Sequence, residues 1–364
     1  ICSFFKVSNT TLRLLNSCIT CCLLSVKVAI PISPTILIFW NSLEFPLFKD
    51  PTSTVVVTEK GELLAARIAD DGQWRFPQSD SVPEKFKVAI SYFEDEYFNY
   101  HLGVNPISFF RAIKQNIEAG EIVSGASTLT MQTIRLSRKG KYRTYFEKSI
   151  ELILATRLEC SKSKASIMNL YASNAPFGGN VVGLEAASWR YFGRSPQNLS
   201  WSENALLAVL PNSPGLLYPG KGQILLTQKR NRLLDRLEKS GVIGEQTCKL
   251  SKLETVPGLP LKLPQNTQHA LSFATTSGSK RVQSTLDYQL QNEAQRVINR
   301  HAEELKANQV HNASAIIVEV ATGNILAYIG NVSTSVEHAN KVDVVKAKRS
   351  TIDRDDRVEC LSRK

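Results

Sequence analysis

The sequence predicts a mainly α-helical protein with a small β element before the helices and an incomplete α/β region after them. Apolar residues recur at helical spacing over residues 86–97, and several further helical stretches follow. A β-branched run occupies residues 53–58, and residues 313–330 have the pattern of strand, turn and strand. These three observations define the expected order of elements.

Length and charge limit the classes of function. The chain has 364 residues and a formal net charge of +11, so it is long enough for two domains and favours an acidic partner, such as a phosphorylated substrate or an anionic membrane. It has no zinc-finger spacing, RNP-like strand or Arg-rich arm, so we expect no nucleic acid as a partner. Four of the seven cysteines lie in the first 22 residues, and their spacing does not fix the redox compartment.

Residues 1–50 are expected to form a membrane anchor or a leader. Residues 14–40 are largely apolar, and Lys6 and Arg13 precede them, as expected of a segment whose start stays on the cytoplasmic side. A spanning helix needs about 20 apolar residues, and one lysine and two prolines interrupt this run. We therefore expect a single-span anchor, and a cleaved or corrupted leader is the alternative.

Residues 51–82 are predicted to form a short β element that leads into the first helix. A Lys-Gly turn follows the β-branched run, and a return strand begins at Leu63. Ser81 and Glu84 have the spacing of a capping box, with Pro83 in the first turn. We therefore expect the Ser81 side chain to cap this helix.

The stretch from Glu94 to Asn105 is the most informative part of the chain. Glu94 and Asp95 precede an aromatic pair that includes Phe98, and His101 follows where an amphipathic helix runs out into a Gly turn. A carboxylate that is held by packing, but that substrate can reach, suits acid/base catalysis. Alone the pattern is ambiguous, because an exposed acidic helix end is most often only solvated.

A run of small and hydroxyl residues at 124–132 is a candidate for binding an anion. It includes Ser127, Thr128 and Gln132, and it leads into a helix that carries Arg135. Small residues let the backbone approach a ligand closely, and hydroxyls beside helix N-terminal N–H groups suit phosphate oxygens. An ordinary helix N-cap would give the same pattern.

The next stretch, residues 139–151, is basic and ends at a second glutamate. Arg143 and Lys148 could clamp a diphosphate, although a basic run is often only a solvated surface. Glu151 is predicted to open an apolar helix.

A loop and two helices complete the helical region. Residues 171–179, which include Asn174, Phe177 and Gly178, are predicted to be a loop. The helix after it is predicted to end at a Gly C-cap. The last one is predicted to begin with a capped turn at residues 199–203 and to lie in the core.

These stretches, taken in order, resemble the family 51 glycosyltransferase domain of class A penicillin-binding proteins. The five family motifs match residues 94–103, 125–132, 143–151, 171–193 and 199–219. Phe177-Gly178-Gly179, Ala187-Ser188-Trp189 and Thr130-Met131-Gln132 are most similar to the 1C-type members. Because the motifs occur in register, the resemblance is specific, and it assigns residues 83–250 to this domain.

The resemblance implies a lysozyme-like, mostly α domain that polymerises lipid II with inversion at the anomeric carbon and release of undecaprenyl diphosphate. Glu94 would be the general base that deprotonates the sugar 4-hydroxyl of the acceptor. Glu151 would orient the sugar or help to hold a divalent cation, Mg²⁺ or Mn²⁺, near the diphosphate. Arg135, Arg143 and Lys148 would neutralise the leaving group. The other residues expected to bind substrate are Asp95, Phe98, His101, Ser127, Thr128, Gln132, Asn174, Phe177 and Gly178.

Three positions depart from the family pattern. Ala126 replaces the second glycine of the usual Gly-Gly-Ser, which is a small intrusion. Glu147 stands where many relatives carry Arg, so one cation is lost from the phosphate side, and Asn105 replaces a frequent Asp. His101 matches the family histidine, and we interpret its role as structural rather than catalytic.

The C-terminal third is predicted to begin a different domain. After a polar linker at residues 251–281, residues 282–351 resemble the opening of a penicillin-binding transpeptidase domain. In relatives an Arg-Ser-Thr or Arg-Ser-Pro triplet precedes the acylated Ser of a Ser-x-x-Lys motif, whereas residues 352–364 are a charged tail. Without that Ser and Lys no acyl-enzyme can form, so we expect no transpeptidase activity. We reject Ser161-x-x-Lys164 as a substitute, because it falls between helical stretches.

The sequence therefore predicts a peptidoglycan glycosyltransferase anchored in the bacterial inner membrane, with its catalytic domain on the periplasmic side. The expected partners are lipid II, the growing glycan strand, the inner membrane and cell-wall synthesis proteins. Two other classes stay open. The cationic cluster argues against a lysozyme-like glycan hydrolase, and the presence of both glutamates argues against a catalytically silent cell-wall scaffold or pseudogene product.

Overall fold

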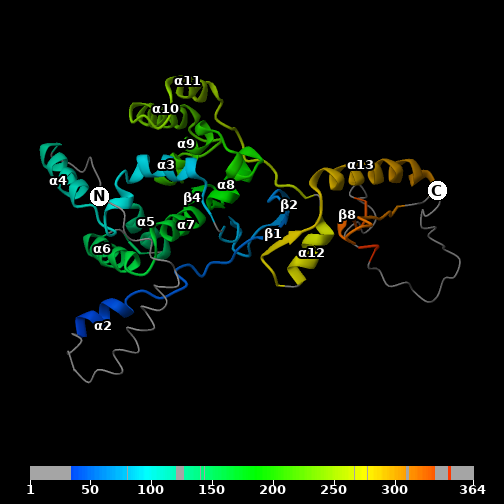
Figure 1. The fold of residues 1–364 in the computed structure, drawn as a ribbon, viewed down its shortest axis with the longest axis horizontal. Coiled ribbons are helices and arrows are strands. Elements are labelled where there is room, and N and C mark those ends of the chain that lie inside the picture. Colours follow the sequence, from blue (N-terminus) through cyan, green and yellow to red (C-terminus); the bar gives the residue numbers. More distant parts are fainter. Residues whose placement is uncertain are drawn as a thin grey trace. The chain divides into compact units, whose positions relative to one another are not determined.

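The structure is a computed structural model, shown in Figure 1, and it divides into two compact units, Ile1–Leu47 and Phe48–Lys364. It describes residues 34–79, 81–119, 127–139, 141–142, 144–265, 267–276, 278–308, 311–332 and 343–345. The first unit contributes one described helix, α2 (Pro34–Asn41), so most of the predicted anchor lies outside the described residues. Among the residues that are described, no helix combines the length and the apolar character needed to cross a membrane.

The helical region predicted for residues 83–250 is present, and the fold class is mainly α. Helix α9 is buried over nearly its whole length and packs against α3 and α10, whereas α5 packs against α6 and α7 (Figure 1). The helices are α3 (Glu84–Glu94), α4 (Pro106–Ala119), α5 (Leu129–Ser137), α6 (Tyr145–Glu159), α7 (Lys164–Asn174), α8 (Leu184–Phe192), α9 (Trp201–Val209), α10 (Gln223–Lys239) and α11 (Glu245–Leu253), joined by the 3₁₀ turns Phe98–Tyr100, Pro196–Asn198 and Leu210–Asn212.

Caps read from the sequence explain several helix ends. Ser200 and Glu203 form the two reciprocal hydrogen bonds of a capping box at the start of α9. The Thr128 hydroxyl accepts a hydrogen bond from the Met131 N–H at 3.1 Å and so caps α5. Helix α8 ends at Gly193, whose φ of 68° is the left-handed conformation expected of a C-cap glycine.

Three local predictions were wrong. Helix α3 begins at Glu84 with Pro83 at its N-cap and without a side-chain cap; a proline keeps the residue before it extended, which separates Ser81 from the helix. Helix α6 begins at Tyr145 because Thr144 caps it, so Glu151 lies in mid-helix and does not open a helix. Residues 171–179 are not a loop: they form the end of α7 and then strand β4 (Pro176–Gly178), which pairs with β5 (Val181–Val182).

The β element contains the predicted hairpin and one strand from far along the chain. Strand β1 (Thr54–Thr58) pairs antiparallel with β2 (Leu63–Arg67) and parallel with β6 (Arg281–Ser284). Helix α12 (Gln268–Thr276) packs on β1 and β2, and the short strand β3 (Trp74–Arg75) pairs with β5. Residues 251–281 are therefore more than a linker, because their second half completes the core around this sheet.

The first elements predicted for the C-terminal region are also present. Helix α13 (Tyr288–Leu305), followed by the 3₁₀ turn Lys306–Asn308, packs against β8 (Ile325–Ile329), which pairs antiparallel with β7 (Ala315–Val318). The Gln291 side chain joins helix to strand: it donates to the Tyr328 carbonyl at 3.1 Å and accepts from the Tyr328 N–H at 2.8 Å. The predicted tail at 352–364 lies outside the described residues.

Candidate active site

Glu94 is the last residue of α3, and α5 holds its carboxylate. Gln132 donates from Nε2 to Glu94 Oε2 at 2.7 Å, whereas Oε1 is buried and has no hydrogen-bond partner among the described residues. Burial is the main cause that raises the pKa of Glu94, and the neighbouring Asp95 raises it further. The Gln132 hydrogen bond and the charges of Arg135 and Lys229 act in the opposite direction. The result is a positioned carboxyl whose pKa lies above its ordinary value, as a general base requires.

Asp95 ties the end of α3 to the start of α5. Its side chain is 3% exposed, and the carboxylate lies 3.0 Å from His101 Nε2 and accepts from the Leu129 N–H at 3.1 Å. The Thr128 hydroxyl donates to the Gly103 carbonyl at 2.6 Å, which fixes the intervening turn against α5. A Cβ at Gly103, where φ is 85°, would lie 2.8 Å from the backbone of α6, so the close approach requires glycine.

This network gives four residues of the predicted site a structural role. Asp95, Phe98, His101 and Thr128 were predicted to bind substrate, but their side chains are buried. Phe98 lies under the Lys164 ammonium, 4.5 Å from the ring centroid, and the other three bond to protein groups. They can therefore set the relative position of Glu94 and Gln132 without touching a substrate, and the structural interpretation of His101 agrees with this placement.

Glu151 lies on α6 and is 7% exposed. Its charge acts on Arg138, and Arg138 donates from Nε to Glu147 Oε1 at 2.5 Å. This hydrogen bond is the main cause that lowers the pKa of Glu147. Gln132 and Arg135 lie three residues apart on α5 and so share one side of the helix, and Arg138 follows three residues later as its C-cap. Helix α5 therefore links the surroundings of Glu94 to those of Glu147 and Glu151.

The described residues do not form a resident cation site around Glu151. Within that part of the chain, the acidic, His and Cys side chains close enough to share an ion are Asp235, Glu238 and Cys248, and Lys252 already pairs with Asp235. Mg²⁺ is usually held by one or two carboxylates together with substrate phosphates and water, so Glu151 would be the carboxylate that the chain supplies beside a diphosphate.

Sequence comparison places this geometry in a known family. A family described as Transglycosylase matches residues 60–238. The biosynthetic peptidoglycan transglycosylase of Haemophilus influenzae is 31% identical over 206 residues, which cover 56% of this chain and 83% of that protein. The chain belongs to the transglycosylase family. The predicted resemblance is thereby confirmed.

Longer relatives share this transglycosylase region. Penicillin-binding protein 1C of Escherichia coli is 35% identical over 309 residues, which are 84% of this chain and 40% of that protein. The chain thus spans less than half the length of this penicillin-binding protein. A solved structure of penicillin-binding protein 1A from Haemophilus influenzae aligns with 75% of this chain and 32% of that one, at 17% identity and a TM-score of 0.33, which is too low to support an argument.

The other predicted residues of the transglycosylase region are spread over several elements. Phe177 is fully buried, and position 178 requires glycine: its φ is 106°, and a Cβ there would lie 2.3 Å from Tyr218 Cβ. Asn174 donates to the Leu170 carbonyl at 2.9 Å within its own helix. Ser127 is half-buried just before α5, Lys148 is half-buried on α6, and Arg143 lies outside the described residues.

Sequence reasoning missed three residues of this site. The hydrogen bond to Glu147, together with the charges of Glu147 and Glu151, raises the pKa of Arg138. Burial raises the pKa of Glu94 and the charge of Lys229 lowers it, whereas burial and the charge of Glu94 both raise the pKa of Tyr171. Lys229 belongs to α10 and reaches Glu94 only through tertiary packing, so no local pattern could have identified it. Tyr171 was part of a predicted loop, and the helical continuity of α7 turns it inward.

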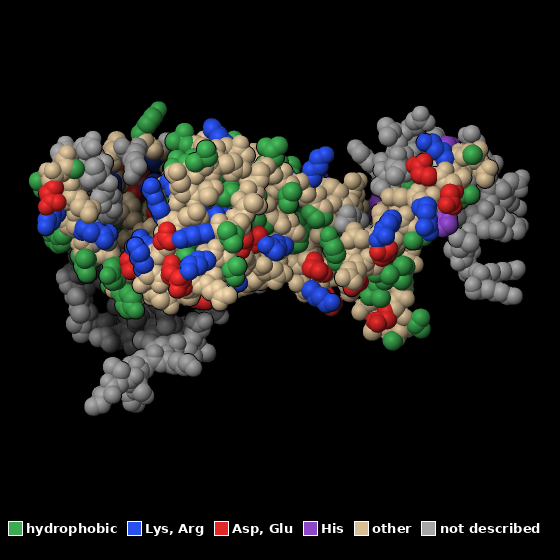
Figure 2. Space-filling model, turned by 90° about the horizontal axis from the view of Figure 1, so that it is seen from above, with side chains coloured by type: hydrophobic (Ala, Val, Ile, Leu, Met, Phe, Trp, Pro, Cys, Tyr) green, Lys and Arg blue, Asp and Glu red, His purple; other side chains and the backbone are tan. Residues whose placement is uncertain are grey.

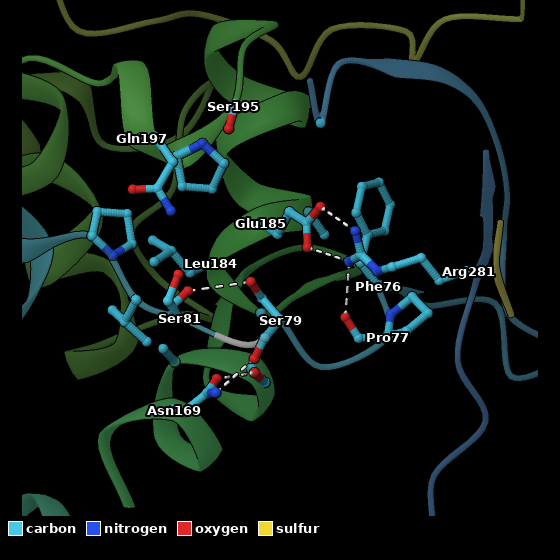
Figure 3. A pocket seen from close by; sticks show the side chains of 18 of the residues that line it. Phe76, Pro77, Ser79, Ser81, Asn169, Leu184, Glu185, Ser195, Gln197 and Arg281 are labelled. Carbon is cyan, nitrogen blue, oxygen red and sulfur yellow. Dashed lines mark hydrogen bonds and ion pairs between the residues drawn. The ribbon is translucent and has the colours of Figure 1, made fainter. Parts of the chain in front are cut away.

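A separate cavity of about 220 Å³ lies beside α8 (Figure 3). Arg281 of β6 pairs with Glu185 at 2.5 Å and donates to the Pro77 carbonyl at 3.1 Å. Asn169 donates to the Ser79 carbonyl at 2.6 Å on the opposite wall. The residues that line the cavity include neither Glu94 nor Glu151, so the cavity is distinct from the acidic site.

Charges of both signs share the described surface. On the face in Figure 2 the described Lys and Arg side chains are interspersed with Asp and Glu.

The rejected Ser161-x-x-Lys164 pattern has no nucleophilic arrangement: Ser161 donates to the Arg157 carbonyl at 3.2 Å, and Lys164 pairs with Glu159 at 2.7 Å.

Proposed function

We propose that this chain is a peptidoglycan glycosyltransferase that polymerises lipid II. The observation that carries the proposal is the Glu94 carboxylate. It is half-buried at a helix end and held on one oxygen by Gln132, its other oxygen is buried without a partner among the described residues, and the cations Arg135 and Lys229 act on it. Membership of the transglycosylase family supplies the class of substrate.

In the proposed reaction Glu94 removes the proton from the 4-hydroxyl of the acceptor sugar. The hydroxyl oxygen forms a bond to the anomeric carbon of the donor, and the bond from that carbon to the diphosphate oxygen breaks. The diphosphate leaves with the electron pair, and the configuration inverts. Cationic side chains lower the free energy of the charge that develops on the leaving group. Arg135 has a second effect, because its charge also stabilises the ionised form of Glu94.

We further propose that the protein works at the periplasmic face of the bacterial inner membrane, with cell-wall synthesis proteins as partners. A lipid-linked substrate requires access to a membrane. Exposed apolar side chains support such a location: Ile107 and Phe110 of α4 and Tyr145 and Phe146 of α6 are each at least 67% exposed. Large apolar surfaces of this kind suit lipid or protein contacts.

The test is polymerisation of labelled lipid II by the detergent-solubilised chain, with products separated by length. Long glycan strands support the proposal. Shortening of preformed glycan without polymerisation would identify a lysozyme-like hydrolase. No change in either substrate, from protein that circular dichroism shows to be folded, would identify a silent scaffold and refute the proposed activity.

A further inference from the structure

Tyr171 carries a buried hydroxyl whose hydrogen bonding is incomplete. The residue lies on α7 and is 1% exposed, and its Oη has no hydrogen-bond partner among the described residues. Helix α7 packs against α5, the helix that carries Gln132 and Arg135. A buried hydroxyl without a partner lowers the free energy of unfolding, so such a group beside a candidate site needs a structural or functional reason.

The matching acceptor is on Glu94. Glu94 Oε1 is also buried and also has no partner among the described residues, while Oε2 is held by Gln132. The charges of Glu94 and Arg135 both act on the Tyr171 phenol, so the three side chains share one environment. Burial raises the pKa of Tyr171 well above its ordinary value. The phenol therefore stays protonated at neutral pH and can act there as a hydrogen-bond donor but not as a base.

We propose that Tyr171 is a positioning residue for Glu94. Its hydroxyl donates a hydrogen bond to Glu94 Oε1, while the Gln132 amide donates to Oε2, so that the carboxylate is held from both oxygens. We expect this bond to form in the working enzyme, where Glu94 must be ionised. The role rests on the proposed function only in so far as Glu94 is the base. The hydrogen bond itself is a property of the protein and can be measured without turnover.

The other groups around Glu94 are accounted for. Arg135 of α5 and Lys229 of α10 favour its charged form, and Asp95 disfavours it. Helix α9, which packs along α3, carries Glu203, and that carboxylate is paired with Arg194. On α7 itself, Lys164 is paired with Glu159. A Tyr171→Phe variant leaves all of these groups in place and removes one donor.

The experiment is a titration of Glu94 by ¹³C NMR in the full chain, with glutamate labelled at the side-chain carboxyl carbon. The Glu94 resonance is assigned by its absence in a Glu94→Gln variant. In Tyr171→Phe we expect the pKa of Glu94 to rise by about one unit, because the charged form loses a donor. Tyr191→Phe is the control: Tyr191 is also buried, but its hydroxyl donates to the Phe177 carbonyl at 3.0 Å, so the pKa of Glu94 should not move.

A second measurement covers the case in which Tyr171→Phe does not fold. In the parent labelled with [¹³Cζ]tyrosine, the Tyr171 resonance should shift with the titration of Glu94, and this shift should vanish in Glu94→Gln. An unchanged Glu94 pKa in folded Tyr171→Phe, or a Tyr171 resonance that ignores the titration, would overturn the proposal. If the titrations agree with it but the parent makes no polymer, the proposed function fails and the positioning role stands.

Discussion

Replacing Asp95 by Asn tests whether the network behind Glu94 is a positioning device. The substitution keeps size and shape, but exchanges a carboxylate oxygen for an NH₂ group. In the parent the carboxylate accepts from two donors, His101 Nε2 and the Leu129 N–H, at 3.0 and 3.1 Å. An amide oxygen can satisfy one of these donors, and the NH₂ group then faces the other.

The geometry gives the magnitude of the effect. Hydrogen bonds to a charged group contribute about 1.5–3 kcal/mol each, and a carboxylate at a helix N-terminus adds about 0.3–1 kcal/mol. Since one donor loses its acceptor and the other keeps a weaker one, we expect Asp95→Asn to lower the free energy of unfolding by about 2–4 kcal/mol. Because Leu129 opens the helix that carries Gln132, polymerisation should also fall, by about 10–100-fold.

Urea unfolding followed by far-UV circular dichroism measures the first quantity. Glu96→Gln is the matched control: Glu96 is the next carboxylate along the chain, and its side chain is 39% exposed in a surface pair with Arg236. That variant should change the free energy of unfolding by less than about 0.5 kcal/mol. If Asp95→Asn were as stable and as active as Glu96→Gln, the positioning account would be refuted.

Three further predictions concern separate parts of the site. Burial raises the folded-state pKa of Glu94, so its charge lowers the free energy of unfolding at a pH above the unfolded-state pKa and has no effect well below it. Glu94→Gln should therefore unfold at a higher urea concentration than the parent at pH 7. A difference of the same size at pH 3 would contradict this. Gly178→Ala should lower the melting temperature much more than Gly179→Ala, because a Cβ at Gly178 would overlap Tyr218 whereas nothing lies within 4 Å of one at Gly179; equal shifts would contradict this. Glu147→Gln should lower the KM for lipid II at low salt, because it frees Arg138 to meet a diphosphate; an unchanged KM would show that Arg138 does not face the donor.

Local sequence predicted the elements whose signals are local. The hairpin at β1 and β2, the capped start of α9, the Gly end of α8 and the strand–turn–strand at β7 and β8 each depend on a cap, a turn or an alternation within a few residues. The family motifs include both Glu94 and Gln132, whose side chains are in contact at 2.7 Å. Five motifs in register carry more information than any one pattern.

The errors arose where distant contacts or competing caps decide. Strand β6 joins β1 from more than two hundred residues away in the sequence, and helix α12 covers that sheet, so a region that looks like a polar linker completes a core. Thr144 starts α6 earlier than the apolar run suggested. Lys229 of α10 acts electrostatically on Glu94, and Glu94 acts on Tyr171 of α7; only tertiary packing brings these helices near each other.

The most direct test of the central claim is the rate of lipid II polymerisation by Glu94→Gln beside the parent, at equal folded concentration and at a pH above the raised pKa of Glu94. The account predicts long glycan strands from the parent and a loss of at least about 10²-fold in the variant, as expected when a positioned general base is removed. Polymer formed by Glu94→Gln at the parental rate would contradict the assignment of the base, and with it the account of the site built around it.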